Sequence, residues 1–152
     1  MPSFSSSRSV AFSPVEMFDL VADIEQYPHF LPLCEALKIR RRGGLDDNRE
    51  MLLADMTVGY KAIRETFTSR VTLDRANLKI LVEYVDGPFS HLENRWTFVN
   101  EGQGTRVEFF IDYQFKSRML GVLMGAMFET AFRKFSDAFV ERAQKVYRGK
   151  IA

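Results

Sequence analysis

The sequence predicts a single α+β domain, in which a curved antiparallel sheet of six to seven strands wraps around one long C-terminal α-helix. Short stretches of alternating apolar and polar residues follow one another from Glu35 to Phe115, with turn residues between them. This pattern is typical of an antiparallel meander. The last fifth of the chain has helical periodicity instead. With 152 residues and no linker-like stretch, we expect residues 1–152 to share one core.

The first part of the chain predicts a strand, a helix and a short helical turn. Residues 6–12 alternate weakly and favour a strand. Ser13 and Pro14, with Glu16 close behind, have the composition of a helix start. The prolines at 28 and 32 then end the helix and favour a turn and loop. The apolar side of the expected helix consists of Val15, Phe18, Leu20, Val21 and Ile24.

The central part predicts antiparallel strands joined by short turns. Turn residues cluster at 43–48, 59–61, 74–77, 86–88 and 100–104. Between them, Ile63, Phe67 and Val71 alternate with polar residues, and residues 106–115 do the same. Such strands have one buried face and one solvated face.

The C-terminal helix, expected from Ser117 to Tyr147, has two different halves. From Phe128 to Val146, apolar residues recur at spacings of three and four, which predicts a helix packed on the sheet. From Met119 to Phe128 no residue is charged, and we interpret residues 119–127 as the wall and gate of an apolar cavity. Gly121 and Gly125 indicate either close helix packing or space for a ligand.

Composition restricts the classes of function. The net charge of +1 gives no overall attraction to DNA or to an anionic membrane. A single cysteine excludes an internal disulfide and favours a reducing, cytoplasmic location. Residues 1–10 lack the apolar run of a secretory signal, and residues 119–128 are too few to span a bilayer, which needs about 20. Fourteen Phe and seven Met suit an adaptable apolar interior.

Neither a catalytic site nor a metal site is predicted. Cys34, His29 and His91 are the only thiol and imidazoles, and no third group is placed to orient a Cys–His pair. No pair of these residues has the spacing of zinc ligands. The sequence also lacks a glycine-rich phosphate loop.

Two sets of polar residues each allow more than one interpretation. Glu65 lies between Ile63 and Phe67, and Asn94 between Leu92 and Trp96. Such a residue either reaches water at a strand end or serves as a polar anchor in an apolar pocket. A second row, expected on one face of a strand, is either solvated or contacts anionic lipid headgroups or RNA phosphates. That row consists of Lys38, Arg40 and Arg42.

Three stretches resemble a known family. Residues 27–34, Tyr-Pro-His-Phe-Leu-Pro-Leu-Cys, resemble the YPxFLPWC-type signature of the coenzyme-Q-binding START-like family, with Leu33 where that family usually has Trp. Residues 58–71 and 87–98 resemble the next two blocks of the same family. The resemblance covers essentially the whole chain, and it extends to the polyketide cyclase superfamily and to bacterial ribosome-association toxin-like proteins.

The resemblance implies a helix-grip fold around a deep hydrophobic cavity, with ubiquinone as the bound ligand and no covalent cofactor. The implied role is that of a quinone chaperone, which supports respiratory electron transport and quinone biosynthesis without catalysis. One alternative is a toxin-like protein that binds a ribosomal subunit. A second is a polyketide-cyclase-type enzyme that works through Glu65 and Tyr113.

Residue patterns and resemblance together predict the cavity lining. A polyisoprenoid tail is longer than a domain of this size can enclose. We therefore expect the cavity mouth to face a membrane in a peripheral contact, with residues 119–124 and the loop at Phe30 and Leu31 at the interface. The expected lining residues are Tyr27, Phe30, Leu31, Leu33, Glu65, Phe67, Val71, Leu92, Asn94, Trp96, Phe109, Tyr113, Met124, Met127 and Phe128.

Overall fold

The element order confirms the expected α+β architecture. The structure is a computed structural model and describes residues 3–148. Its elements are β1 (Ser3–Val10), α1 (Pro14–Ala22), the 3-10 helix η1 (Ile24–His29), β2 (Cys34–Gly44), β3 (Arg49–Tyr60), β4 (Ile63–Asp74), β5 (Lys79–Asp86), β6 (Phe89–Glu101), β7 (Gly104–Phe115) and α2 (Arg118–Arg148).

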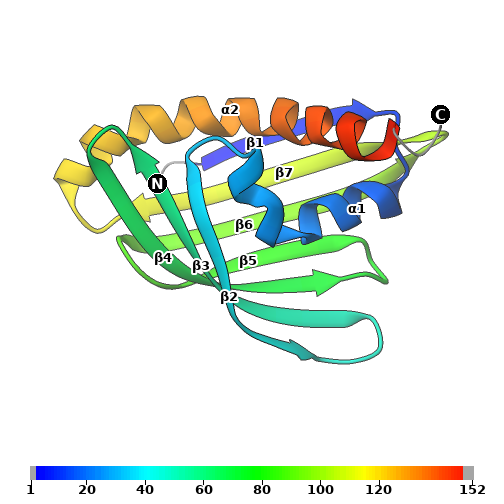
Figure 1. Ribbon diagram of the computed structural model, residues 1–152, viewed down its shortest axis with the longest axis horizontal. Coiled ribbons are helices and arrows are strands. Elements are labelled where there is room, and N and C mark those ends of the chain that lie inside the picture. The colour runs from blue at the N-terminus through cyan, green and yellow to red at the C-terminus, as the bar shows by residue number, and fades with distance from the viewer. Residues whose placement is uncertain (1–2, 149–152) are drawn as a thin grey trace.

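The strands form one seven-stranded sheet in the order β1-β7-β6-β5-β4-β3-β2. Every neighbouring pair is antiparallel, and each of the five predicted turns joins two neighbouring strands. Since β1 pairs with β7, the chain crosses from one edge of the sheet to the other through α1 and η1. Figure 1 shows the curved sheet with α2 lying along it and with α1 and η1 on the same side.

Local signals fix the start of α1. The Ser13 side chain accepts a hydrogen bond from the Glu16 backbone N–H (3.2 Å), and the Glu16 carboxylate accepts one from the Ser13 N–H (3.0 Å). This reciprocal capping box satisfies N–H groups that a helix start leaves free. Val15 was expected on the apolar side but is 49% exposed. The buried residues Met17, Phe18, Leu20 and Val21 form one stripe, and position 15 lies opposite it.

The β1 strand begins earlier than residues 6–12 suggest. It runs from Ser3 to Val10 because the whole segment pairs with β7, from Ser3 opposite Asp112 to Val10 opposite Thr105. A weak alternation within a serine-rich stretch does not reveal this pairing partner.

Aromatic side chains fill most of the space between the sheet and α2. The Trp96 ring lies 4.8 Å from Phe109 and 5.0 Å from Phe139, measured between ring centroids. Phe109 also contacts Phe132 of α2 at 6.2 Å. Aromatic pairs of this kind stabilise a core beyond their buried area, so they fix the position of α2 on the sheet.

Candidate functional site

An apolar cavity of about 110 Å³ lies between the sheet, α2 and the segment that joins η1 to β2. The strand residues that line it recur at every second position, as expected for the inward face of a pleated sheet. Its lining consists of Ile24, Tyr27, Leu31, Pro32, Leu33, Cys34, Leu37, Ala54, Met56, Val58, Phe67, Ser69, Val71, Ile80, Val82, Leu92, Asn94, Trp96, Phe109, Ile111, Phe128, Ala131, Phe132, Phe135 and Phe139.

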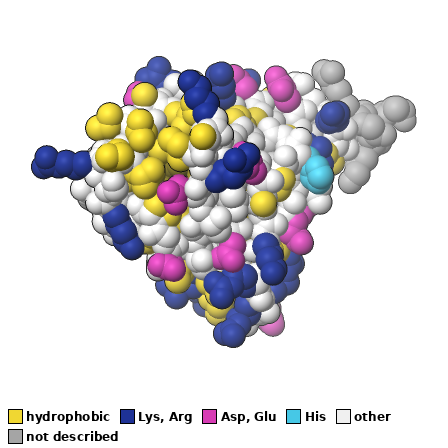
Figure 2. Space-filling view, turned by 60° about the vertical axis from the view of Figure 1, so that its left-hand side comes forward, with side chains coloured by type: hydrophobic (Ala, Val, Ile, Leu, Met, Phe, Trp, Pro, Cys, Tyr) yellow, Lys and Arg dark blue, Asp and Glu magenta, His cyan; other side chains and the backbone are white. Residues whose placement is uncertain are grey.

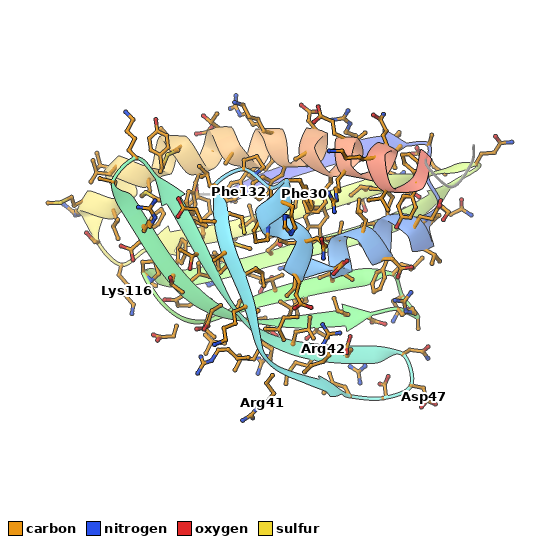
Figure 3. The ribbon with its side chains drawn as sticks, viewed as in Figure 1. Phe30, Arg41, Arg42, Asp47, Lys116 and Phe132 are labelled. Atoms are coloured by element: carbon orange, nitrogen blue, oxygen red, sulfur yellow. The ribbon has the colours of Figure 1, made fainter. Side chains whose placement is uncertain are left out.

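The second half of α2 forms the helical wall of this cavity. Its lining residues are Phe128, Ala131, Phe132, Phe135 and Phe139, which share one side of the helix at spacings of three and four. Figure 3 labels Phe132, together with Phe30 of the loop after η1. The periodic half that was expected only to hold the sheet therefore also faces the cavity.

The first half of α2 supplies no residue from 119 to 127 to the cavity lining, so it is not the expected wall. Its expected role as a gate stays a prediction. Met124 is fully buried and Met127 half-buried, and neither lines the cavity. Aromatic rings fill the space near this end instead, since Phe128 packs against Phe89, Tyr113 and Phe115 at centroid distances of 6.1, 5.9 and 5.3 Å.

Asn94 and Trp96 form a hydrogen-bonded pair on the cavity wall. The Trp96 indole N–H donates to Asn94 Oδ1 (2.9 Å), and the Asn94 amide N–H donates to the carbonyl oxygen of Phe110 (2.8 Å). The amide thus satisfies the buried indole and fixes its orientation. Asn94 was expected to be a polar anchor in an apolar pocket. In the structure, its side-chain amide forms hydrogen bonds with Trp96 and with the backbone of Phe110.

Ser69 is the polar lining residue that sequence reasoning missed. It lies on β4 between Phe67 and Val71 and is 5% exposed. Across residues 3–148, its hydroxyl has no hydrogen-bond partner. No fully buried side-chain polar atom within residues 3–148 lacks a hydrogen-bond partner, so the Ser69 hydroxyl borders the open space of the cavity. The available signal was a serine at an inward position of an alternating strand.

The segment from Tyr27 to Cys34 closes one side of the cavity. The Tyr27 hydroxyl donates to the carbonyl oxygen of Val21, and burial raises the Tyr27 pKa far above its usual value. Leu33 has a φ of 69°, which costs a branched residue roughly 1–2 kcal/mol, and its carbonyl accepts from the Gly59 N–H at 3.0 Å. This contact ties the segment to β3.

Cys34 is a protonated thiol at neutral pH. Burial raises its pKa to about 11, so it lacks the thiolate that nucleophilic catalysis requires. His29 is exposed at the end of η1. Among residues 3–148, no group of three or more His, Cys, Asp or Glu side chains is placed to hold a metal ion.

Phe30, Glu65 and Tyr113 were also expected in the cavity but do not line it. Phe30 packs edge-on against Tyr27 and Phe139. Glu65 is half-buried near the start of β4, which agrees with the strand-end alternative. Tyr113 is buried against Phe128 and Phe132, and this burial raises its pKa. The pair suggested for cyclase chemistry therefore lies outside the cavity.

The basic row does not share one face, because β2 contains a bulge between Ile39 and Arg41. Lys38 lies opposite Asp55, whereas Arg42 lies opposite the buried Leu52 and so on the other face. Arg42 pairs with Glu25 of η1 (3.8 Å) and Glu50 (3.5 Å).

Arg40, at the bulge, pairs with Asp55 at 3.7 Å. Arg41 projects away from the body of the molecule in Figure 3. Within residues 3–148, Lys38 and Arg41 form no ion pair. The cations of β2 without an ion pair in this part of the chain are therefore Lys38, which was expected in the row, and Arg41, which was not.

Fold and cavity together define a class, namely single domains that enclose an apolar space between a curved antiparallel sheet and one long helix. Residues 10–140 match the model of one family, described as polyketide cyclase / dehydrase and lipid transport. The chain belongs to this family. No helix within residues 3–148 is long and apolar enough to cross a membrane.

Curated relatives have two kinds of name. The chain is 32% identical to the ribosome association toxin RatA of Rickettsia prowazekii, over 97% of this chain and 100% of the relative. It is 26% identical to the mitochondrial coenzyme Q-binding protein coq10 of Schizosaccharomyces pombe, over 93% and 86% of the two chains.

Solved structures confirm the START-like fold. The 18 kDa protein CC1736 of Caulobacter crescentus is 33% identical, with a TM-score of 0.80 over 97% of this chain and 99% of that chain. A START superfamily protein of Mycobacterium smegmatis gives a TM-score of 0.77 at 19% identity, over 95% and 98%. The second similarity concerns the fold alone.

Proposed function

We propose that this protein binds a polyprenyl quinone such as ubiquinone and acts as a non-catalytic quinone chaperone, which supports respiratory electron transport and quinone biosynthesis. The observation that carries the proposal is the apolar cavity, whose walls include the rings of Trp96, Phe109 and Phe132. Apolar walls with few polar groups are typical of small-molecule sites. Membership of a family described by lipid transport, and the coenzyme Q-binding relative, support the same ligand class.

The size of the cavity defines which part of the ligand it holds. A protein cavity of about 150 Å³ accepts one benzene molecule, so a cavity of about 110 Å³ must widen, by movement of its side chains, before it admits the larger ubiquinone ring. We infer that the quinone ring enters this space. The isoprenoid tail then extends outward or displaces side chains of α2. The free hydroxyl of Ser69 is available to donate to a quinone carbonyl oxygen.

The intrinsic fluorescence of Trp96 provides a direct test, because it is the only tryptophan. Titration with a short-chain ubiquinone should quench this fluorescence to saturation, since the quinone ring would lie beside the indole. Lipid extracted by solvent from gently purified protein should contain ubiquinone by mass spectrometry. Linear, unsaturable quenching together with no retained quinone would refute the proposal.

A second candidate function is association with a ribosomal subunit. The observations that favour it are the RatA-named relative at 32% identity and the exposed, unpaired side chains of Lys38 and Arg41. Cosedimentation with ribosomal subunits should then weaken steeply as salt rises, because phosphate contacts release counterions. Lys38→Glu with Arg41→Glu should abolish it. Cosedimentation that is absent at low salt would exclude this function.

A further inference from the structure

Large apolar side chains are exposed at the start of α2. Met119 is 71% exposed, Val122 80% and Leu123 54%. These residues, called the α2 patch below, are spaced by three and four and so share one side of the helix. In Figure 2, hydrophobic side chains gather at the upper left of the face turned toward the viewer, and Lys and Arg side chains with a few Asp or Glu side chains lie around them.

No other part of residues 3–148 covers this side of the helix. The glycines on a different side of the same turns are open as well, since a Cβ atom added to Gly121 or Gly125 would meet nothing within 4 Å. The opposite side of the same turns is already packed, because Met124 is fully buried and Leu120 lies against the core. The α2 patch therefore takes no part in the packing of the fold. Contiguous exposed apolar residues of this kind mark an interaction surface.

Positive charge borders the α2 patch. Lys116 and Arg118 immediately precede it and are exposed, and neither forms an ion pair within residues 3–148. No acidic residue occurs between Asp112 and Glu129. At the same end of the molecule in Figure 1, the β3–β4 turn adds Lys61 beside the exposed ring of Tyr60. An apolar patch with basic residues at its border is complementary to a partner that offers apolar groups to the patch and anionic groups to the border.

A second copy of this chain is a poorer occupant. In a two-fold contact, the same patch meets itself. The carboxylate on the same side of the helix, Glu129, already pairs with Arg133 (2.8 Å). The cations that border the patch would therefore approach their own copies, and such like-charge contacts are unfavourable. An anionic bilayer instead offers acyl chains to the apolar residues and phosphate groups to Lys116 and Arg118.

We propose that the start of α2 docks on the surface of an anionic lipid bilayer through Met119, Val122 and Leu123, with Lys116 and Arg118 at the headgroups. The docking surface lies on the outer side of the helix and does not include cavity residues. The proposal therefore goes beyond quinone binding and stands or falls separately from it.

Flotation with lipid vesicles tests the proposal, and the chain offers a matched control. Leu45 is 50% exposed in the β2–β3 turn, compared with 54% for Leu123. That turn lies at the opposite end of the molecule from Lys116, as the neighbouring label Asp47 shows in Figure 3. Leu123→Asp and Leu45→Asp therefore make the same chemical change at equally exposed sites.

We expect the wild-type protein to float with vesicles of phosphatidylcholine and phosphatidylglycerol, and to bind at least tenfold more weakly to phosphatidylcholine alone. Leu123→Asp should weaken binding to the anionic vesicles at least tenfold, and Leu45→Asp should leave it unchanged. Lys116→Gln with Arg118→Gln should remove most of the salt dependence.

Absence of flotation at low salt, or equal losses for Leu123→Asp and Leu45→Asp, would overturn the proposal. So would a dimer in sedimentation velocity that Leu123→Asp dissociates while vesicle binding persists. Quenching of Trp96 by short-chain quinone in the same Leu123→Asp sample reports on the cavity alone, so failure of docking is distinguishable from failure of quinone binding.

Discussion

The two halves of α2 differ in whether their apolar residues are buried. The first half has no charged residue from Met119 to Phe128, yet Met119, Val122 and Leu123 are mostly exposed. The second half carries many charges, yet Phe132, Phe139 and Ala143 are buried. The comparison shows that spacing, rather than hydrophobic content, decides what a helix buries on a sheet.

The physical reason is the geometry of a helix on one surface. A sheet covers only one stripe of a helix, so apolar residues outside this stripe stay in solvent whatever their number. In the second half, the stripe holds most of the large apolar residues, and charged residues occupy most of the other positions. In the first half, Leu120 and Met124 supply the stripe, and the α2 patch is left over.

Truncation of a ring in the second half should give the largest effect. Phe139 is 2% exposed and contacts the rings of Tyr27, Phe30 and Trp96. Phe139→Ala should therefore lower the free energy of unfolding by about 3–5 kcal/mol. Val122→Ala, in the first half, should change it by less than about 0.5 kcal/mol. Urea unfolding measures both values.

A milder variant keeps this comparison measurable if Phe139→Ala does not fold. Phe139→Leu retains most of the apolar volume and should lose only part of that free energy. A cost above about 1.5 kcal/mol for Val122→Ala would mean that the first half is packed, and the contrast between the halves would fail.

Thiol reactivity should be about two-hundredfold lower for Cys34 in the cavity than for a cysteine at the exposed position 122. Cys34 faces the same cavity as the second half of α2, and burial raises its pKa to about 11. A cysteine introduced by Val122→Cys would be exposed, with an ordinary pKa of about 8.5. At pH 8, the raised pKa leaves Cys34 with roughly one two-hundredth of the thiolate at position 122, and thiolate is the reactive form.

Alkylation by iodoacetamide, followed by peptide mass spectrometry, gives both rates in one sample. The rate at position 122 should level off above about pH 9, whereas the rate at Cys34 should continue to rise toward its pKa of about 11. Equal rates at pH 8 would contradict the burial of Cys34.

Much of the fold is predictable because its signals are local. The Ser13–Glu16 capping box and the five turn clusters depend only on neighbouring residues. Strand alternation likewise selects inward residues such as Phe67, Leu92 and Trp96, each of which lines the cavity. These features require no knowledge of which strands pair.

The features that were missed depend on partners distant in sequence. The bulge between Ile39 and Arg41 exists only in the pairing of β2 with β3. The cavity ends near Phe128 because Phe89 of β6 and Phe115 of β7 pack against the Phe128 ring. The Ser69 hydroxyl has no hydrogen-bond partner within residues 3–148. Its neighbours in the cavity wall come from other elements, which no single stretch of sequence encodes.

Filling the cavity from α2 should weaken quinone binding about tenfold. Ala131 is 5% exposed and lines the cavity, so Ala131→Leu places extra methyl groups where we expect the quinone ring. Ala126→Leu makes the same change at an exposed position in the first half and should leave binding unchanged. A tenfold loss corresponds to about 1.4 kcal/mol, and titration of Trp96 fluorescence measures it. Equal affinities would place the ligand elsewhere.

Substitution of the helical glycines should give the smallest effect, and its sign tests the first half directly. Glycine costs roughly 1 kcal/mol relative to alanine inside a helix. Added Cβ atoms at Gly121 and Gly125 meet nothing within 4 Å, which rules out close helix packing as the role of these glycines. Gly121→Ala and Gly125→Ala should therefore each raise the free energy of unfolding by about 0.5–1 kcal/mol, as measured by the urea midpoint. Destabilisation by either variant would reveal a packed neighbour and contradict the open space at these two glycines. Stabilisation accompanied by weaker quinone binding would instead show that the first half must bend to admit the ligand.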